Sequence, residues 1–172
     1  MNAPATRELS SIEISRTALI DVVQAIDPAD QLAVFEIRRR VFAEEQGAPN
    51  LLVSDSDDAR SLIALARIRT PHENGSGWRP AATGRLTPYP LTGVPALVAW
   101  VATLPDVRGR GIGRELMRFL LAAADADGVP EVILAAQAPA EWFYRRLGFE
   151  PTGPLYDVRG IPHRRMSRRR PH

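Results

Sequence analysis

The chain of 172 residues contains no cysteine and no lysine, and only 6 % of its residues are aromatic. Without cysteine, a disulfide framework, a thiolate metal site and a cysteine nucleophile are excluded. Without lysine, the P-loop lysine and a lysine Schiff base are excluded as well. No apolar run approaches the roughly 18 residues that a membrane-spanning helix needs. Met1–Ser11 is polar and unlike a secretory signal, so we expect a cytoplasmic protein.

All 22 basic residues are therefore arginines, and the net charge is +2. They cluster at 38–40, 108–118 and 164–170. Such clusters are often solvated surface, but they also attract polyanions. Because the few aromatics are not interleaved with the arginines, a small phosphorylated ligand is favoured over a nucleic acid. Nucleic-acid binding through the arginines at 164–170 is kept as an alternative.

The length fits one domain, which we place at residues 17–172 after a lead-in at 1–16. Alternating strand-like and helix-like segments predict a mixed α/β sheet. Asp27 is expected to cap the first helix, with Pro28 in its first turn. The expected strands span residues 18–26, 62–70, 82–87, 97–103 and 132–136, with a strand or hairpin over 149–167. The expected helices span residues 28–46, 113–126 and 139–147, and loops span 50–60 and 71–80.

The most informative segment leads from the strand ending at Thr103 into the helix after Gly113. Its centre, Arg108-Gly109-Arg110-Gly111-Ile112-Gly113-Arg114, places three glycines and three arginines at a helix N-terminus. Free N–H groups and the helix dipole bind phosphates there, and glycines let the backbone approach closely. The Rossmann spacing fails, because its third glycine position holds Arg114. A simple glycine turn remains the structural alternative.

Two motifs at the right separation resemble the GNAT superfamily of N-acetyltransferases. Arg108-x-x-Gly111-x-Gly113 resembles its pyrophosphate-binding signature. The segment from Ala140 to Phe149, which contains Phe143-Tyr144, resembles its second signature. Three further segments resemble the ElaA-like branch: 40–46, 136–137 and 160–163.

The resemblance implies a mostly antiparallel central sheet flanked by helices, with a splayed strand pair forming the acyl-CoA cleft. It implies that acetyl-CoA is the acyl donor. With only three histidines in the chain, no metal site is expected. A bulge would expose backbone groups to the pantetheine arm. The implied CoA-binding residues are Val101, Ala102, Thr103, Arg108, Gly109, Arg110, Gly111, Ile112, Gly113, Arg114, Gln137 and Phe143.

Tyr144 matches the general acid of the superfamily, and packing is its structural alternative. Its hydroxyl can donate to a departing thiolate, whose conjugate acid has a pKa near ~8.5. Glu45 lies on the apolar stripe of the first helix, with Arg38 beside it. Both are candidate substrate residues, although pairing with each other or with the loop is the favoured alternative. His163 is expected to be structural, and Asp55, Asp57 and Asp58 to form a solvated loop or contact the acceptor.

Three positions depart from the branch, with Ser61, Trp100 and Val158 where histidine, arginine and glutamate are expected. They leave the acceptor open, whether a small molecule or a peptide. The leading hypothesis is direct attack of a primary amine on acetyl-CoA, since no cysteine can carry the acyl group. The alternative is a catalytically reduced acyl-CoA sensor. A homodimer is also left open.

Overall fold

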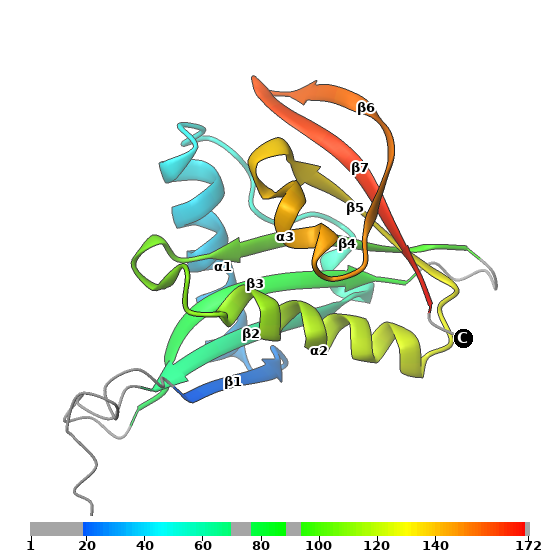
Figure 1. Cartoon of the computed structure of the whole chain (residues 1–172). Helices are drawn as coiled ribbons and strands as arrows, with labels where there is room; N and C mark the ends of the chain where they lie inside the picture. The colour runs from blue at the N-terminus through cyan, green and yellow to red at the C-terminus, as the bar shows by residue number, and fades with distance from the viewer. Residues whose placement is uncertain (1–18, 70–76, 89–93, 171–172) are drawn as a thin grey trace, which may run out of the picture.

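The computed structural model describes residues 19–69, 77–88 and 94–170. In these ranges seven strands form one sheet in the order β1-β2-β3-β4-β5-β7-β6 (Figure 1). All neighbours are antiparallel except β4 and β5, which are parallel. The strands are β1 (Leu19–Gln24), β2 (Leu62–Arg69), β3 (Arg79–Thr87), β4 (Ala96–Thr103), β5 (Glu131–Gln137), β6 (Glu150–Val158) and β7 (Ile161–Arg169).

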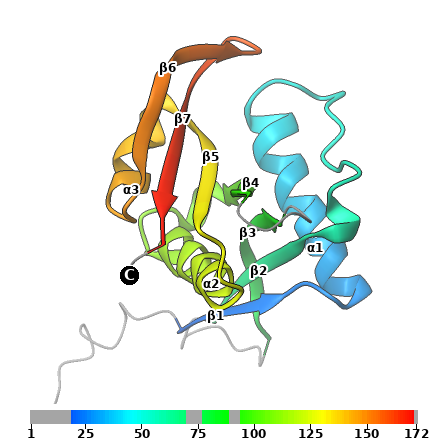
Figure 2. The same cartoon turned by 90° about the vertical axis from the view of Figure 1, so that its right-hand side faces the viewer.

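Helices cover both faces of the sheet. The helix α1 (Pro28–Arg38) lies on the opposite side of β2, β3 and β4 from α2 (Ile112–Ala126), as Figure 2 shows. The short helix α3 (Glu141–Arg145) follows a 3-10 turn after β5. The apolar stripe predicted for the second helix is buried against the sheet: Leu116, Met117, Leu120, Leu121 and Ala124.

The first helix differs from its prediction in two ways. The Asp27 side chain makes no capping hydrogen bond, although Pro28 does occupy the first turn. The α-helix ends at Arg38, and the chain continues as a π-helix, η2 (Arg39–Glu45), instead of one helix to Gln46. A π-helix is rare and is frequently found at functional sites. The π-helix therefore indicates that the segment after α1 contributes to a functional site.

The remaining boundaries differ by a few residues. β3 begins at Arg79, before the expected start at Ala82, and the 50–60 loop contains a 3-10 turn, η3 (Asp58–Arg60). The predicted hairpin near the C-terminus is confirmed as β6 and β7. The expected lead-in at 1–16 lies outside the described residues, as do residues 71–76 of the expected connection. In the described ranges no helix is long and apolar enough to cross a membrane.

Candidate active site

The parallel strands β4 and β5 pair only at their beginnings. Ala96 and Leu97 lie opposite Val132 and Ile133, and the described strands share no pairing beyond that point. In a parallel ladder evenly spaced hydrogen bonds join the two strands wherever they pair. The backbone groups of β4 that follow Leu97 on this side therefore have no partner in β5. The splayed strand pair expected from the sequence is present.

β4 also bulges against its other neighbour, β3. Gly84 of β3 lies opposite two residues of β4, Trp100 and Val101. Trp100 adopts φ 55°, in the left-handed region that is unusual for a bulky residue. A bulge takes backbone groups out of the ladder. It lies at the start of the predicted pantetheine-binding residues Val101, Ala102 and Thr103, whose role remains a prediction.

The predicted phosphate cradle joins β4 to α2 through a 3-10 turn, η4 (Pro105–Val107). Gly109 and Gly111 follow with φ of 77° and 82°, a conformation that strongly favours glycine. Gly111 directly precedes α2, so it is the N-cap residue of that helix. The N–H groups of the first helical turn lack partners within the helix and are available to an anion.

Gly113, in the first turn of α2, is closely packed. A Cβ atom on Gly113 would lie 3.3 Å from Oγ1 of Thr103 and 3.6 Å from Cζ of Phe143. The end of β4 and the short helix α3 therefore meet the N-terminus of α2 through this glycine. The structure thus brings together both sequence motifs, which lie about thirty residues apart in the chain.

Arg108 of the cradle is held by a carboxylate. Its Nη1 and Nη2 donate to Oε1 and Oε2 of Glu45 at 2.8 and 2.7 Å, and its Nε donates to the Thr103 carbonyl oxygen at 3.0 Å. These hydrogen bonds lower the pKa of Glu45. The expected pairing of Glu45 with Arg38 or the loop is wrong, because the π-helix carries Glu45 to the cradle. Arg110 and Arg114 are exposed.

Tyr144 has a buried ring, 8 % exposed, between Phe143 and Phe149. Burial raises the pKa of its hydroxyl to about 12. Among the described residues its hydroxyl has no hydrogen-bond partner. It is nevertheless not one of the fully enclosed polar atoms that lack a partner, which are all arginine Nε atoms. The hydroxyl oxygen therefore keeps a small contact with solvent. Because its pKa is raised, it stays protonated at neutral pH. Its matched role as general acid remains a prediction.

Gln137 and His163 face each other in the ladder between β5 and β7. Both are partly buried. Nδ1 of His163 lies 2.8 Å from the Ile161 carbonyl oxygen, and its ring is tilted against Tyr156 at 6.2 Å. His163 is thus engaged within the hairpin, in line with its expected structural role. Gln137 ends β5 on the splayed side of the sheet, and its contact with pantetheine remains a prediction.

Arg38 cannot contact an acceptor in this arrangement, which corrects its candidacy as a substrate residue. Its side chain is fully buried. Nη1 donates to the Val53 carbonyl oxygen at 3.0 Å and to the Asp58 carboxylate at 2.9 Å. The guanidinium also lies over the Trp100 ring, 5.2 Å from its centroid. The alternative interpretation, that Arg38 pairs with the loop, is the one that the structure shows.

The acidic loop is anchored rather than solvated. Asp55 and Asp58 both accept hydrogen bonds from Arg85, a buried residue of β3 that no sequence pattern singles out. Asp55 also accepts from Nε1 of Trp100 at 3.1 Å, and these bonds lower its pKa to about 2. The described part of the chain contains no group of three or more side chains able to hold a metal.

The three departures from the branch pattern lie in different surroundings. Ser61 donates to the Asp57 carbonyl oxygen at 2.6 Å and bonds to Oγ1 of Thr87 at 2.9 Å. Trp100 packs edge-on against Phe42 of the π-helix, with ring centroids 5.2 Å apart. Val158 is exposed at the end of β6. Ser61 is therefore tied to the acidic loop and the end of β3, and Trp100 to the π-helix, whereas Val158 leaves its position without a charge.

Comparisons with known proteins agree with this geometry. Residues 96–170 match a family model described as an acetyltransferase (GNAT) domain. A provisionally named acetyltransferase of Bacillus subtilis is 27 % identical over 151 residues, which cover 87 % of this chain and 96 % of that protein. Protein ElaA of Escherichia coli is 28 % identical over 143 residues, which cover 79 % of this chain and 85 % of ElaA.

Solved structures show the same fold. The crystal structure of Escherichia coli ElaA has a TM-score of 0.71 at 23 % identity, covering 88 % of this chain and 99 % of that one. An acyl-CoA N-acyltransferase from Pseudomonas aeruginosa has a TM-score of 0.71 at 24 % identity, with coverage of 88 % and 99 %. The mixed, mostly antiparallel fold expected from the sequence is confirmed.

Proposed function

We propose that this chain, whose residues 96–170 match a GNAT acetyltransferase domain and which is similar to ElaA, transfers an acetyl group from acetyl-CoA to a primary amine by direct attack in a ternary complex. The observation that carries the proposal is the splay of β4 from β5 directly before the glycine-rich N-terminus of α2. A single sheet that contains β1 to β7 supports the prediction that residues 17–172 form one domain.

The cytoplasmic location remains a prediction, and a homodimer remains an open possibility.

The donor would lie along the splay, with its phosphates at the start of α2. Gly109 and Gly111 shape the turn with positive φ, and the N–H groups from Ile112 onward face the phosphates. The exposed side chains of Arg110 and Arg114 add positive charge there. Val101 and Thr103 would offer backbone groups that have no partner in β5 to the pantetheine amides, with Gln137 on the β5 side. The Thr103 carbonyl oxygen already accepts a hydrogen bond from Arg108. Phe143 would contact the same arm beside Gly113.

Direct attack forms a bond from the amine nitrogen to the thioester carbon and breaks the bond from that carbon to sulfur. Tyr144 donates its proton, or a hydrogen bond, to the departing sulfur. The attacking nitrogen releases its surplus proton to solvent, from which the phenol is re-protonated. Because burial holds the pKa of Tyr144 at about 12, the hydroxyl is available as a donor throughout the neutral range. The ammonium form of an alkylamine has a pKa near ~10.4, so the acceptor must lose a proton before attack.

Glu45 is the acidic group proposed on the acceptor side. It ends the π-helix and is exposed. While Arg108 holds it, its lowered pKa makes it a weak base. A donor phosphate that draws Arg108 away would restore its basicity. Glu45 would then receive the proton of the acceptor ammonium directly or through water.

Turnover of acetyl-CoA against a broad amine library, with the acetylated product identified by mass spectrometry, tests the proposal. Release of CoA that depends on an amine and yields the matching amide supports it. Calorimetric binding of CoA without turnover of any amine would favour the sensor module. No binding of CoA at millimolar concentration would exclude both.

A further inference from the structure

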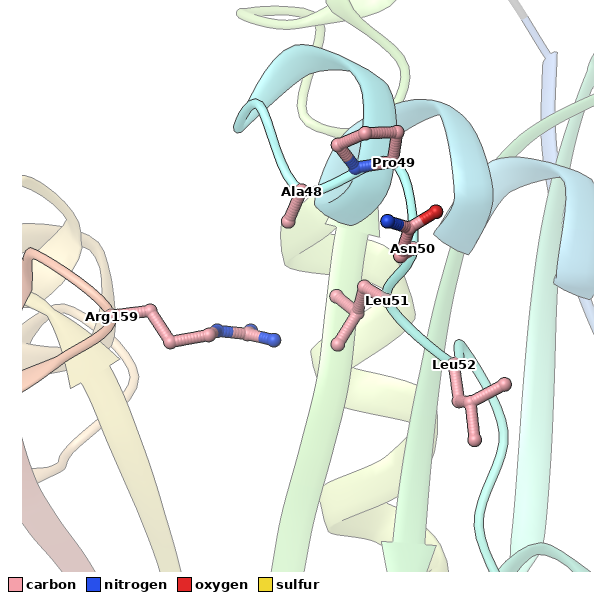
Figure 3. Close-up of a pocket in the computed structure, with 6 residues that line it drawn as sticks. All are labelled: Ala48, Pro49, Asn50, Leu51, Leu52 and Arg159. Atoms are coloured by element: carbon pink, nitrogen blue, oxygen red, sulfur yellow. The ribbon is translucent and has the colours of Figure 1, made fainter.

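A pocket of about 370 Å³ lies between the loop after the π-helix and the turn that joins β6 to β7 (Figure 3). The side chain of Arg159 extends from the turn toward Leu51 of the loop (Figure 3). The pocket begins at Ala48, three residues after Glu45 in the chain. Its lining residues are Ala48, Pro49, Asn50, Leu51, Leu52 and Arg159.

The backbone at Arg159 is strained. Val158 pairs with Ile161, so Arg159 and Gly160 form a two-residue turn with φ of 53° and 80°. Hairpin turns with positive φ at both positions strongly prefer asparagine, aspartate or glycine. Among the described non-glycine residues, only Trp100 shares a positive φ. Strained residues gather at functional sites, because the strain persists only where it is compensated or selected.

The charge of Arg159 has no partner in the described part of the chain, where no carboxylate forms an ion pair with it. The rest of the lining is apolar apart from the Asn50 amide. The pocket therefore combines one planar cation with an apolar wall. An arginine fork matches a carboxylate with two parallel hydrogen bonds.

We infer that this pocket selects the acceptor: a primary amine whose other end is a carboxylate, joined by an apolar segment. Arg159 binds the carboxylate, and the side chains of Leu51 and Leu52 contact the apolar segment. The amine then points toward the end of the π-helix, where Glu45 lies. The inference rests on the proposed function, because it names the acceptor class for that reaction. It also gives a reason for an arginine at a position where glycine or asparagine would fold more easily.

The test compares acceptors that differ only in the charge of the far end. A series of ω-amino acids of increasing length around 6-aminohexanoate is assayed beside the matching carboxamides, such as 6-aminohexanamide. In each pair the reacting amine is nearly the same. We expect the intact protein to prefer the acid by about 10- to 100-fold in kcat/KM, the range of a charge-assisted hydrogen bond.

The variants R159N and R159A should remove that preference by lowering kcat/KM for the acids alone. R159N should also raise Tm, because asparagine tolerates the positive φ of the turn. A merely structural arginine would give the opposite pattern of lower Tm and equal losses for both acceptors. R169A is the matched control, since it removes an exposed arginine at the far end of the same hairpin. It should leave the preference unchanged.

A second readout does not depend on turnover. Calorimetry with hexanoate and hexanamide, in the presence of CoA, should show binding of the acid that R159A abolishes. Acetylation of acids and amides at equal rates, or loss of CoA affinity in R159A, would overturn the inference while the proposed function stands. Binding of hexanoate through Arg159 without acetylation of any amine would overturn the proposed function and keep the pocket. If hexanoate does not bind and acids are not preferred over amides, the inference is overturned.

Discussion

The guanidinium of Arg108 lies against the carboxylate of Glu45 with two parallel hydrogen bonds, at 2.8 and 2.7 Å. The pair joins the phosphate cradle to the end of the π-helix, the two surfaces where donor and acceptor would meet. Both side chains are more than one-third exposed, at 45 % and 39 %, so solvent screens their attraction. A diphosphate with several charges can therefore compete with Glu45 for Arg108.

Replacing Glu45 with glutamine should tighten CoA binding. The substitution removes the competing carboxylate while keeping its size, and exposed ion pairs contribute about 0.2–1 kcal/mol, which corresponds to about 1.5- to 5-fold in affinity. Calorimetry with CoA measures the change. E44Q is the control, because Glu44 pairs with Arg39 and not with the cradle. Unchanged affinity in E45Q would mean that Arg108 keeps its carboxylate when CoA binds.

Replacing Arg108 with alanine should weaken CoA by about tenfold, the scale of one charge-assisted hydrogen bond. Pantetheine, which has no phosphate, should lose much less. R118A is the control, since Arg118 lies on α2 beyond the cradle and is exposed. Equal losses for CoA and pantetheine would assign Arg108 a structural role, through its hydrogen bond to the Thr103 carbonyl oxygen.

Gly111→Ala and Gly113→Ala should both weaken CoA, for different reasons. A Cβ on Gly111 meets no atom within 4 Å, but its φ of 82° costs a side chain roughly 1–2 kcal/mol. At Gly113 the Cβ would press on Oγ1 of Thr103 and contact the Phe143 ring. CoA titration and Tm measure the two effects. Gly153→Ala is the control, because Gly153 has neither positive φ nor a neighbour within 4 Å, and a similar loss there would contradict this account.

The strands and helices could be predicted because their signals are local. The apolar stripe of α2 and the glycines before it mark both the helix and the cradle in the sequence alone. The π-helix could not be predicted, since the apolar pattern of α1 continues through it without a break. Its consequence, the approach of Glu45 to Arg108, was missed for the same reason.

The burial of Arg85 was missed because its partners are distant in sequence, whereas a pairing of Arg38 with the loop was the favoured alternative. Arg38 and Arg85 both donate to Asp58, which lies 20 and 27 residues away in the chain. A single sequence does not show which charged side chains meet. The positive φ of Trp100 also has no local signal in the sequence, because the bulge between β3 and β4 determines this backbone conformation. The expectation of a solvated acidic loop was wrong for the same reason, because Asp55 and Asp58 are bound by Arg85 of β3.

Replacing Asp55 with asparagine should flatten the acid dependence of stability. Hydrogen bonds from Arg85 lower the pKa of Asp55 to about 2 from 3.8. A lowered pKa contributes stability that is present above 3.8 and is lost as pH falls toward about 2. Urea unfolding at a series of acidic pH values measures the slope, which should be shallower in D55N. The control is D127N, at an exposed residue after α2. An unchanged slope in D55N would show that the contact with Arg85 does not persist in solution.

Replacing Tyr144 with phenylalanine should lower kcat by about 10²–10³-fold while CoA affinity changes little. Phenylalanine keeps the packing against Phe143 and Phe149, so only the hydroxyl is lost. The stability should hardly change, because the hydroxyl has no hydrogen-bond partner among the described residues. F149L is the control for packing. It should lower Tm, since Phe149 is 1 % exposed, without a comparable loss of kcat.

The dependence on the leaving group separates proton donation by Tyr144 from a packing effect. A donor with a more acidic thiol needs less help from an acid, so the loss in Y144F should shrink with such donors. The loss should shrink at high pH as well, where a free thiolate leaves without assistance. The pKa of Tyr144, about 12, lies above the assay range, so the intact protein should show no fall in rate from its ionisation. A loss that is the same for every thiol and pH would mean that Tyr144 acts through packing, and that water supplies the proton to sulfur.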